Sequence, residues 1–312
     1  MNKKIFNRII SLLVAFVFVI SFPLYSFAIV DGTTNEYSFT VEDVVDAYRS
    51  NDIKKLCEMV NELMPEEENK EPEIVPLWSS DTRYPKEEEK MCHSFITGMG
   101  CLFYVGAIAE KGYDVSKNGI TLEDIEILMK YSELPDLIER GICFENHFYN
   151  PYTNSTFTGP LSITAKHEFI YYYNLATVDP FHNSAIMDLG MALHFIQDVN
   201  EPHHAANITA VDKGSTHSEF EEYVSLHKER ISEKYYRIGI NESVLSSDPG
   251  SLLHMSAKYS YAYALDANKP KVDPNITVID ANWDRVGEIT LKHAISDTVN
   301  VIYKFIKETN RI

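Results

Sequence analysis

The chain has 312 residues and a formal net charge of −18 at pH 7, from 46 acidic and 28 basic side chains. Such an acidic balance offers no polybasic surface to a phosphate backbone, so we expect no nucleic-acid partner. It also disfavours electrostatic docking to anionic lipid.

The N-terminal residues 1–28 have the features of a secretory signal peptide. A basic start is followed by the apolar run 9–22 and by Ser26-Phe27-Ala28, which fits a small-x-small cleavage site. The alternative is a retained membrane anchor. However, the run is shorter than the roughly 20 apolar residues of a spanning helix, and no later segment reaches that length. We therefore expect a secreted, extracellular protein with no transmembrane segment in its mature chain.

A short helical segment and a linker follow the signal peptide. Thr40 and Asp43 have the spacing of a capping box and predict the start of an amphipathic helix that runs to about Met64. The proline- and glutamate-rich stretch 65–73 is typical of a linker. The linker separates this helix from the rest of the chain.

The remainder of the chain, 78–312, shows helical patterns throughout. The helix predicted at 91–111 is too apolar to face solvent, so His93 near its start is expected in the interior. Further helices are predicted at 121–140, 164–176, 184–199, 217–230 and 283–306. Since no segment alternates as a strand would, the sequence predicts an all-α fold with a single compact multi-helix domain.

Two pairs of metal-ligating side chains lie close together in the stretch 193–224. His194 and Asp198 are four residues apart, as are His217 and Glu221, so each pair shares one helix face and can close on one ion. Imidazole and carboxylate are good ligands for zinc. A single pair of this kind is usually a surface pair or a satisfied buried histidine. Two pairs, with a further histidine after a proline-terminated helix between them, favour a metal centre.

The two pairs and the segment 200–207 between them, Asn-Glu-Pro-His-His-Ala-Ala-Asn, resemble the signature of the bacterial zinc-dependent phospholipases C. Members of this family are secreted enzymes with three zinc ions, and the single-strand-specific zinc nucleases share their fold. The family motif makes His204 the ligand and His203 the variable position. The resemblance extends over 78–312.

The resemblance also predicts a function for Trp78, which lies at the start of the segment 78–312. Family members begin, once processed, with a tryptophan whose α-amine and carbonyl oxygen bind zinc. Trp78 lies fifteen residues before His93, which resembles the first ligating histidine of the family. An amine can bind zinc only as a free, deprotonated terminus. Residues 29–77 would then be a helical propeptide, removed by cleavage after Leu77. The alternative is that Trp78 is an ordinary aromatic residue at the edge of a linker.

His147, in a His-Phe-Tyr-x-Pro segment, resembles the second ligating histidine of the family. The family places an aspartate shortly before it, as a zinc ligand and candidate general base. No aspartate lies between Gly141 and His147, so we predict that Glu145 takes both roles.

The resemblance therefore implies three zinc ions. The first would have His147, His194, Asp198 and Glu145, the second His204, His217 and Glu221, and the third Trp78, His93 and a bridging Asp198. Close zinc ions neutralise a phosphodiester and lower the pKa of a bound water.

The implied activity is that of a secreted zinc-dependent phospholipase C. It would cleave the glycerol-phosphate ester of phospholipids with a zinc-activated water, releasing diacylglycerol and a phosphorylated head group. Asp81 and Phe144 match family positions that favour choline, which predicts phosphatidylcholine as substrate. The protein would act as a monomer at a membrane or micelle surface.

Two alternatives remain open. A zinc-dependent nuclease or 3′-nucleotidase of the same fold needs the same ligands, although the glutamate at position 221, the acidic balance and the propeptide favour the phospholipase. The second alternative is a secreted helical protein in which the zinc ions are purely structural. Structural sites use four protein ligands, whereas His204, His217 and Glu221 leave a position open.

Overall fold

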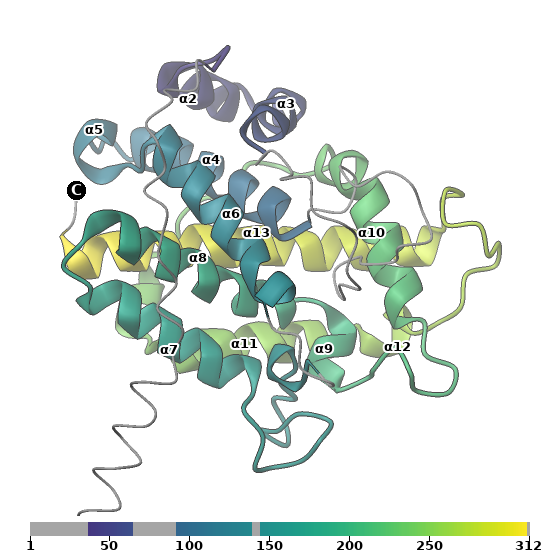
Figure 1. The fold of residues 1–312 in the computed structure, drawn as a ribbon. Helices are drawn as coiled ribbons and strands as arrows, with labels where there is room; N and C mark the ends of the chain where they lie inside the picture. The colour runs from purple at the N-terminus through teal and green to yellow at the C-terminus, as the bar shows by residue number, and fades with distance from the viewer. Residues whose placement is uncertain (1–36, 65–91, 139–143, 311–312) are drawn as a thin grey trace, which may run out of the picture. The chain divides into compact units, whose positions relative to one another are not determined.

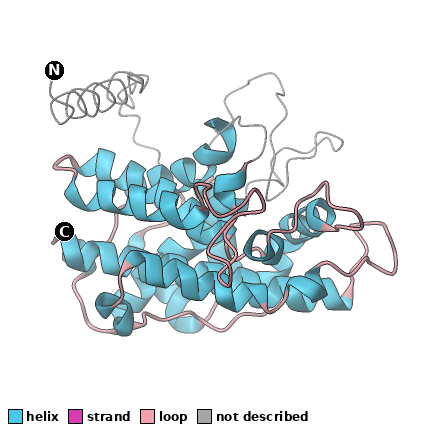
Figure 2. Ribbon diagram, turned by 90° about the horizontal axis from the view of Figure 1, so that it is seen from below, coloured by secondary structure: helices cyan, strands magenta, loops and turns pink. Residues whose placement is uncertain are grey.

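The computed structural model describes residues 37–64, 92–138 and 144–310. Regular structure in these ranges is helical (Figure 2), apart from isolated bridges between Asn150 and Ser155 and between Thr156 and Gly159. The all-α prediction is therefore confirmed. The expected signal peptide, Trp78 and Asp81 lie outside the described residues.

Within the described ranges, the connections between helices vary in length from two residues, as at 51–52, to 17 residues, at 148–164. In chain order the helices are α2 (Val41–Ser50), α3 (Ile53–Leu63), α4 (Cys92–Glu110), α5 (Val115–Asn118), α6 (Leu122–Ile138), η2 (Glu145–His147), α7 (Ala165–Val178), α8 (His182–Asp198), α9 (Pro202–Ala206), α10 (His217–Ser232), η3 (Glu242–Ser246), α11 (Pro249–Tyr261), α12 (Ala264–Ala267) and α13 (Ala281–Thr309). The long α13 packs against α4, α8 and α10 and lies at the centre of the helical assembly (Figure 1).

Helix α4 is a core helix. Every residue from Cys92 to Ile108 is buried, as its apolar sequence predicts. In the described part of the chain it is the one helix long and apolar enough to cross a membrane, but 94% of its apolar window is buried inside the protein. A Cβ atom at Gly100 would lie 2.4 Å from Thr298 Cγ2, so the crossing of α4 and α13 requires glycine at this point.

The prediction of a single helix from Thr40 to Met64 is wrong in one respect, because the structure has two helices there. The capping box of Thr40 and Asp43 is present. The chain then turns at Asn51, which has a left-handed φ of 57°, a conformation that asparagine tolerates well. Asp52 restarts the helix by accepting a hydrogen bond from Lys55 N at 3.0 Å. The residue pair Asn51-Asp52 was the signal for this break.

Three of the helices that carry the clustered residues, α8, α9 and α10, are consecutive in the chain. Helix α8 ends before Pro202, as predicted, but Pro202 also occupies the first turn of the short helix α9, a position that suits proline. Asn207, with a φ of 59°, ends α9, and a loop leads to α10. The predicted starts of α7, α10 and α13 agree with the structure to within two residues. Helix α11 was not predicted, although Asp248 and Pro249 form a standard helix start.

Candidate metal centre

Five buried residues from four elements form a first group of metal-ligating side chains. They are His93 at the start of α4, Asp136 near the end of α6, His147 in η2, and His194 and Asp198 on α8. Helix packing brings these elements together, since α8 contacts both α4 and α6. The spacing of His194 and Asp198 places both on one face of α8, as the sequence predicts.

Four atoms of the first group meet at short distances. His147 Nδ1 lies 2.8 Å from Asp198 Oδ2 and 2.9 Å from His194 Nε2, which itself lies 3.0 Å from Asp198 Oδ2. Asp136 Oδ1 lies 3.6 Å from both of these imidazole nitrogens. Ligand atoms around a tetrahedral zinc ion, at bonds of about 2.0–2.1 Å, are about 3.3 Å apart. The observed distances lie on both sides of this value, so the four atoms fit a zinc-sized ion.

Asp198 connects the first group to its neighbours. While its Oδ2 faces His147 and His194, its Oδ1 lies 3.5 Å from His93 Nε2 and 3.5 Å from His204 Nδ1. His93 Nε2 is also 3.7 Å from Asp136 Oδ2. Asp198 is completely buried and therefore faces four imidazole rings at once. This is the geometry of a carboxylate that bridges adjoining sites.

Hydrogen bonds fix the orientation of two of the histidines. The Nδ1 of His194 donates to the carbonyl oxygen of Ser132 at 2.8 Å, which leaves Nε2 with a lone pair directed into the group. His93 Nδ1 lies 2.9 Å from Gln197 Oε1 and donates to it. The Gln197 amide in turn donates to Thr97 and Thr298, so its orientation is set by α4 and α13.

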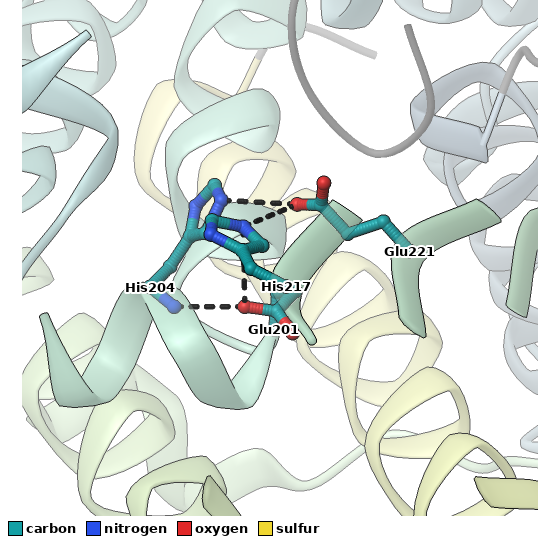
Figure 3. Close-up of side chains that lie close together, drawn as sticks. All are labelled: Glu201, His204, His217 and Glu221. Carbon is teal, nitrogen blue, oxygen red and sulfur yellow. Dashed lines mark hydrogen bonds and ion pairs between the residues drawn. The ribbon is translucent and has the colours of Figure 1, made fainter. Parts of the chain in front are cut away.

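A second group lies beside the first and consists of Glu201, His204, His217 and Glu221 (Figure 3). The rings of His204 and His217 both face the Glu221 carboxylate. Glu221 Oε1 lies 3.2 Å from His204 Nε2 and 2.8 Å from His217 Nε2. Phe148 stacks on the His204 ring with centroids 4.5 Å apart and covers this side of the group.

Glu201 and His203 were not among the predicted ligands, yet both are completely buried, Glu201 within the second group and His203 beside it. Glu201 Oε2 accepts a hydrogen bond from His204 N at 2.7 Å, which caps α9, and lies 4.0 Å from His217 Nε2. Its Oε1 accepts a hydrogen bond from His203 Nδ1 at 2.7 Å. The His203 ring is parallel to the His217 ring, with centroids 5.1 Å apart. Glu201 thus contacts the backbone of one ligand candidate and, through His203, the ring of another.

The buried charges of the two groups shift one another's pKa values. Burial alone would raise the pKa of Asp198, but His194 and His147 hold it well below its usual range. Burial raises the pKa of Asp136 well above its usual range, against the effect of His147 and His93. Burial lowers the pKa of His194 to about 4. Carboxylates and imidazoles therefore compete for protons in a space from which water is excluded.

The donor set fits a cation better than it fits a network of hydrogen bonds. Asp136 Oδ1, Asp198 Oδ1 and His204 Nδ1 are buried and make no hydrogen bond to any residue in the described ranges. Unsatisfied buried polar atoms are costly, and three in one place call for a further partner. Imidazole nitrogens and carboxylate oxygens are the ligands that zinc prefers besides thiolate.

The two groups contain His93 and six further predicted ligands, but Glu145 lies outside them. The six are His147, His194, Asp198, His204, His217 and Glu221. In the described structure Glu145 is only partly buried and its carboxylate accepts a hydrogen bond from Thr158. Glu145 and His147 are two residues apart in a 3₁₀-helix of three residues per turn, so their side chains point in different directions. The prediction that Glu145 is the carboxylate next to His147 does not agree with this geometry.

Asp136 occupies the place that was assigned to Glu145. It was not predicted because the aspartate was expected after Gly141, where the helix was expected to end. The signal was present in α6, where Ser132 and Asp136 are four residues apart and share one face. Both contact His194, Ser132 through its carbonyl oxygen and Asp136 through its carboxylate.

Phe144 lies at the edge of the first group. Its ring centroid is 5.8 Å from that of His147, and the residue has a left-handed φ of 41°. The side chain is partly exposed. Its predicted partner in head-group binding, Asp81, lies outside the described residues, as does Trp78.

Known proteins share both sequence and fold with this chain. A phospholipase C of Clostridium perfringens is 22% identical over 235 residues, which is 70% of this chain and 59% of the relative. A phospholipase C of Bacillus cereus is 26% identical over 174 residues, which is 50% of this chain and 56% of the relative. The chain is thus similar in sequence to bacterial phospholipases C. No family model matches the sequence.

Solved structures share the fold of this chain. The alpha toxin of Clostridium absonum superposes with a TM-score of 0.59 at 19% identity, covering 72% of this chain and 65% of the toxin. The Clostridium perfringens alpha-toxin from an avian strain gives a TM-score of 0.57 at 22% identity. The chain spans less than two thirds of the length of these toxins and of the two sequence relatives.

Proposed function

We propose that this protein is a zinc-dependent phospholipase C that is secreted and acts as a monomer on phospholipid at a membrane or micelle surface. The names of its sequence relatives support the reaction class. The observation that carries the proposal is the position of Asp198, a buried carboxylate between two adjoining groups of histidines and acids. Adjoining metal sites suit a phosphodiester, because they can neutralise its charge and stabilise the attacking and leaving oxygens together.

The proposed ligands follow the geometry of the two groups. One ion is held by Asp136, His147, His194 and Asp198, and a second by His204, His217 and Glu221, with Glu201 beside it. A third is held by His93 and Asp198 together with the α-amine and carbonyl oxygen of Trp78 after cleavage behind Leu77. When bound, the zinc ions supply Lewis-acid activation of the phosphoryl group and of water.

The residues of the chain position and protect this chemistry. Ser132 and Gln197 hold the rings of His194 and His93 in the tautomers that present Nε2. Within the first group, Asp136 replaces Glu145 as the carboxylate that can accept a proton from water. Phe148 covers His204 and excludes water from that side.

The proposed substrate is phosphatidylcholine. Phe144 lies next to His147, where an aromatic face can bind a quaternary ammonium group, and Asp81 would add a negative charge once Trp78 is in place. Cleavage would release diacylglycerol and phosphocholine.

The test uses the chain cut before Trp78 and supplied with zinc. Phosphate-ester cleavage is measured on phosphatidylcholine micelles and, in parallel, on single-stranded DNA and a 3′-nucleotide. We expect chelator-sensitive release of diacylglycerol. Nucleotide release without lipid cleavage would keep the metal ligands and replace the function by that of a nuclease. Zinc binding without either activity would indicate structural metal sites and contradict the proposal.

A further inference from the structure

The helical hairpin formed by α2 and α3, residues 37–64, packs on α4 within the folded protein (Figure 1). The sequence assigns this hairpin to a propeptide, which would be lost after cleavage. In the structure, however, the compact unit that contains α4 begins at Tyr37. The hairpin is therefore a part of the same unit as the candidate metal centre.

Apolar burial holds the hairpin in place. Both helices bury a complete apolar face, which consists of Val44, Ala47, Tyr48, Ile53, Leu56, Cys57, Met59, Val60 and Leu63. The Tyr48 ring packs edge-on against Phe103 of α4, with centroids 6.0 Å apart. Removal of the hairpin would expose this side of α4, whose residues from Cys92 to Ile108 are all buried. Exposed apolar surface of this kind is unfavourable in water.

The sequence of α4 is adapted to the hairpin by two glycines. A Cβ atom at Gly106 would lie 2.1 Å from Tyr48 Cγ, and one at Gly98 would lie 2.9 Å from Val60 Cγ1. The hairpin therefore approaches the α4 backbone more closely than any larger residue at these points allows. Glycine lowers helix propensity, so its presence here has a packing reason.

Directional hydrogen bonds connect the hairpin to a second part of the domain. Tyr48 Oη donates to the carbonyl oxygen of Ile238 at 3.2 Å, and Arg237 N donates to Asn51 Oδ1 at 2.7 Å. Asn61 Nδ2 donates to Glu229 Oε1 on α10 at 3.0 Å. The Arg237 guanidinium also lies 5.6 Å from the centre of the Tyr48 ring. These contacts fix the position of the hairpin, in addition to the apolar burial that holds it on α4.

We infer that residues 37–64 remain bound to α4 after a cut anywhere in 65–91, so that the mature protein is a noncovalent complex of the hairpin and the catalytic part. The two glycines of α4 that the hairpin approaches, Gly98 and Gly106, both lie more than one turn after His93. A new N-terminus can therefore be produced without release of the hairpin. The inference concerns packing and does not depend on the proposed activity.

The experiment introduces a specific protease site between residues 65 and 77 of the full chain. After cleavage, the protein is separated by size exclusion in native buffer and in denaturant, and the fragments are identified by mass. We expect both fragments in one native peak and in separate peaks under denaturant. Elution of the hairpin fragment apart from the larger fragment in native buffer would overturn the inference, whatever the activity of the larger fragment.

A matched pair of variants tests the contacts themselves. Tyr48→Ala removes the ring that fills the space at Gly106, and we expect the hairpin to bind at least ~30-fold more weakly after the cut. Lys54→Ala, on the exposed side of α3, should leave binding unchanged. Equal retention in both variants would contradict the role of Tyr48. If Tyr48→Ala impairs folding before the cut, hydrogen exchange is measured in α4 of both uncut variants. Loss of protection in Tyr48→Ala, but not in Lys54→Ala, would also show that Tyr48 holds the hairpin on α4.

Discussion

At the scale of single residues, the identity of the carboxylate next to His147 decides how the first group works. Asp136 Oδ1 lies 3.6 Å from His147 Nδ1 and from His194 Nε2, whereas Glu145 accepts a hydrogen bond from Thr158. A carboxylate at the distance of Asp136 can complete a four-ligand set, and one directed elsewhere cannot. The two acids should therefore behave very differently when neutralised.

We expect Asp136→Asn to lower phospholipase activity by at least ~100-fold and to reduce zinc binding, because it removes a charged ligand from a buried site. Glu145→Gln is the matched control and should retain activity within about threefold. The measurements are initial rates on phosphatidylcholine micelles and bound zinc in both variants. Loss of activity in Glu145→Gln with activity retained in Asp136→Asn would restore the assignment made from the sequence.

Glu201 gives a second prediction at this scale. A glutamine at this position can still accept the hydrogen bond from His204 N, so the cap of α9 and the stability should change little. The negative charge next to His203 and His217 is lost, and we expect zinc to bind the second group about 10–100-fold more weakly. Competition with a chelating dye measures this affinity, and Glu219→Gln on the exposed side of α10 is the control. Equal affinity in the two variants would show that Glu201 acts only as a cap.

At the scale of helices, α10 and α13 are joined by a cluster of charges away from both groups. Asp284 on α13 accepts a hydrogen bond from Arg230 Nη1 at 2.9 Å and contacts Lys234 Nζ at 2.7 Å. Tyr223 Oη also donates to Asp284 at 2.7 Å. The hydrogen bonds from Arg230, followed by those from Lys234 and Tyr223, hold the pKa of Asp284 below its usual range. Because the side chain retains some contact with solvent, we attribute about 1–2 kcal/mol to this arrangement.

Asp284→Asn should therefore lower the free energy of unfolding at pH 7 by about 1–2 kcal/mol. The folded-state pKa is lowered, so the stabilisation is complete above about pH 4, the unfolded value, and is lost as the pH falls below it. Urea unfolding of the metal-free wild type and variant at several pH values measures the difference. Glu288→Gln, which removes a more distant and exposed partner of Lys234, should change stability by less than about 0.5 kcal/mol. A difference for Asp284→Asn that persists unchanged at pH 3 would contradict the role of its charge.

At the scale of the whole molecule, short-range spacing in the sequence predicts the helical class and two pairs of the clustered residues, whereas His93, His147 and His204 were predicted from the family resemblance. The pairs His194–Asp198 and His217–Glu221 need only the helical repeat to bring their members together. Asp136 could not be placed in this way, since its position depends on where α6 ends and on how α6 packs against α8. The fate of the hairpin was also beyond the sequence, because an apolar face predicts burial without naming the surface that covers it.

The most direct test of the account is the number of zinc ions bound per chain, measured by native mass spectrometry. The chain cut before Trp78, with its hairpin 37–64 still bound, should bind three ions. The uncut chain should bind two firmly and the third weakly, because its Trp78 nitrogen is then an amide. Asp198→Asn should lower the count in both forms, since this carboxylate faces His93, His147, His194 and His204. A single ion per chain, or a count that does not change in Asp198→Asn, would contradict adjoining sites that share Asp198.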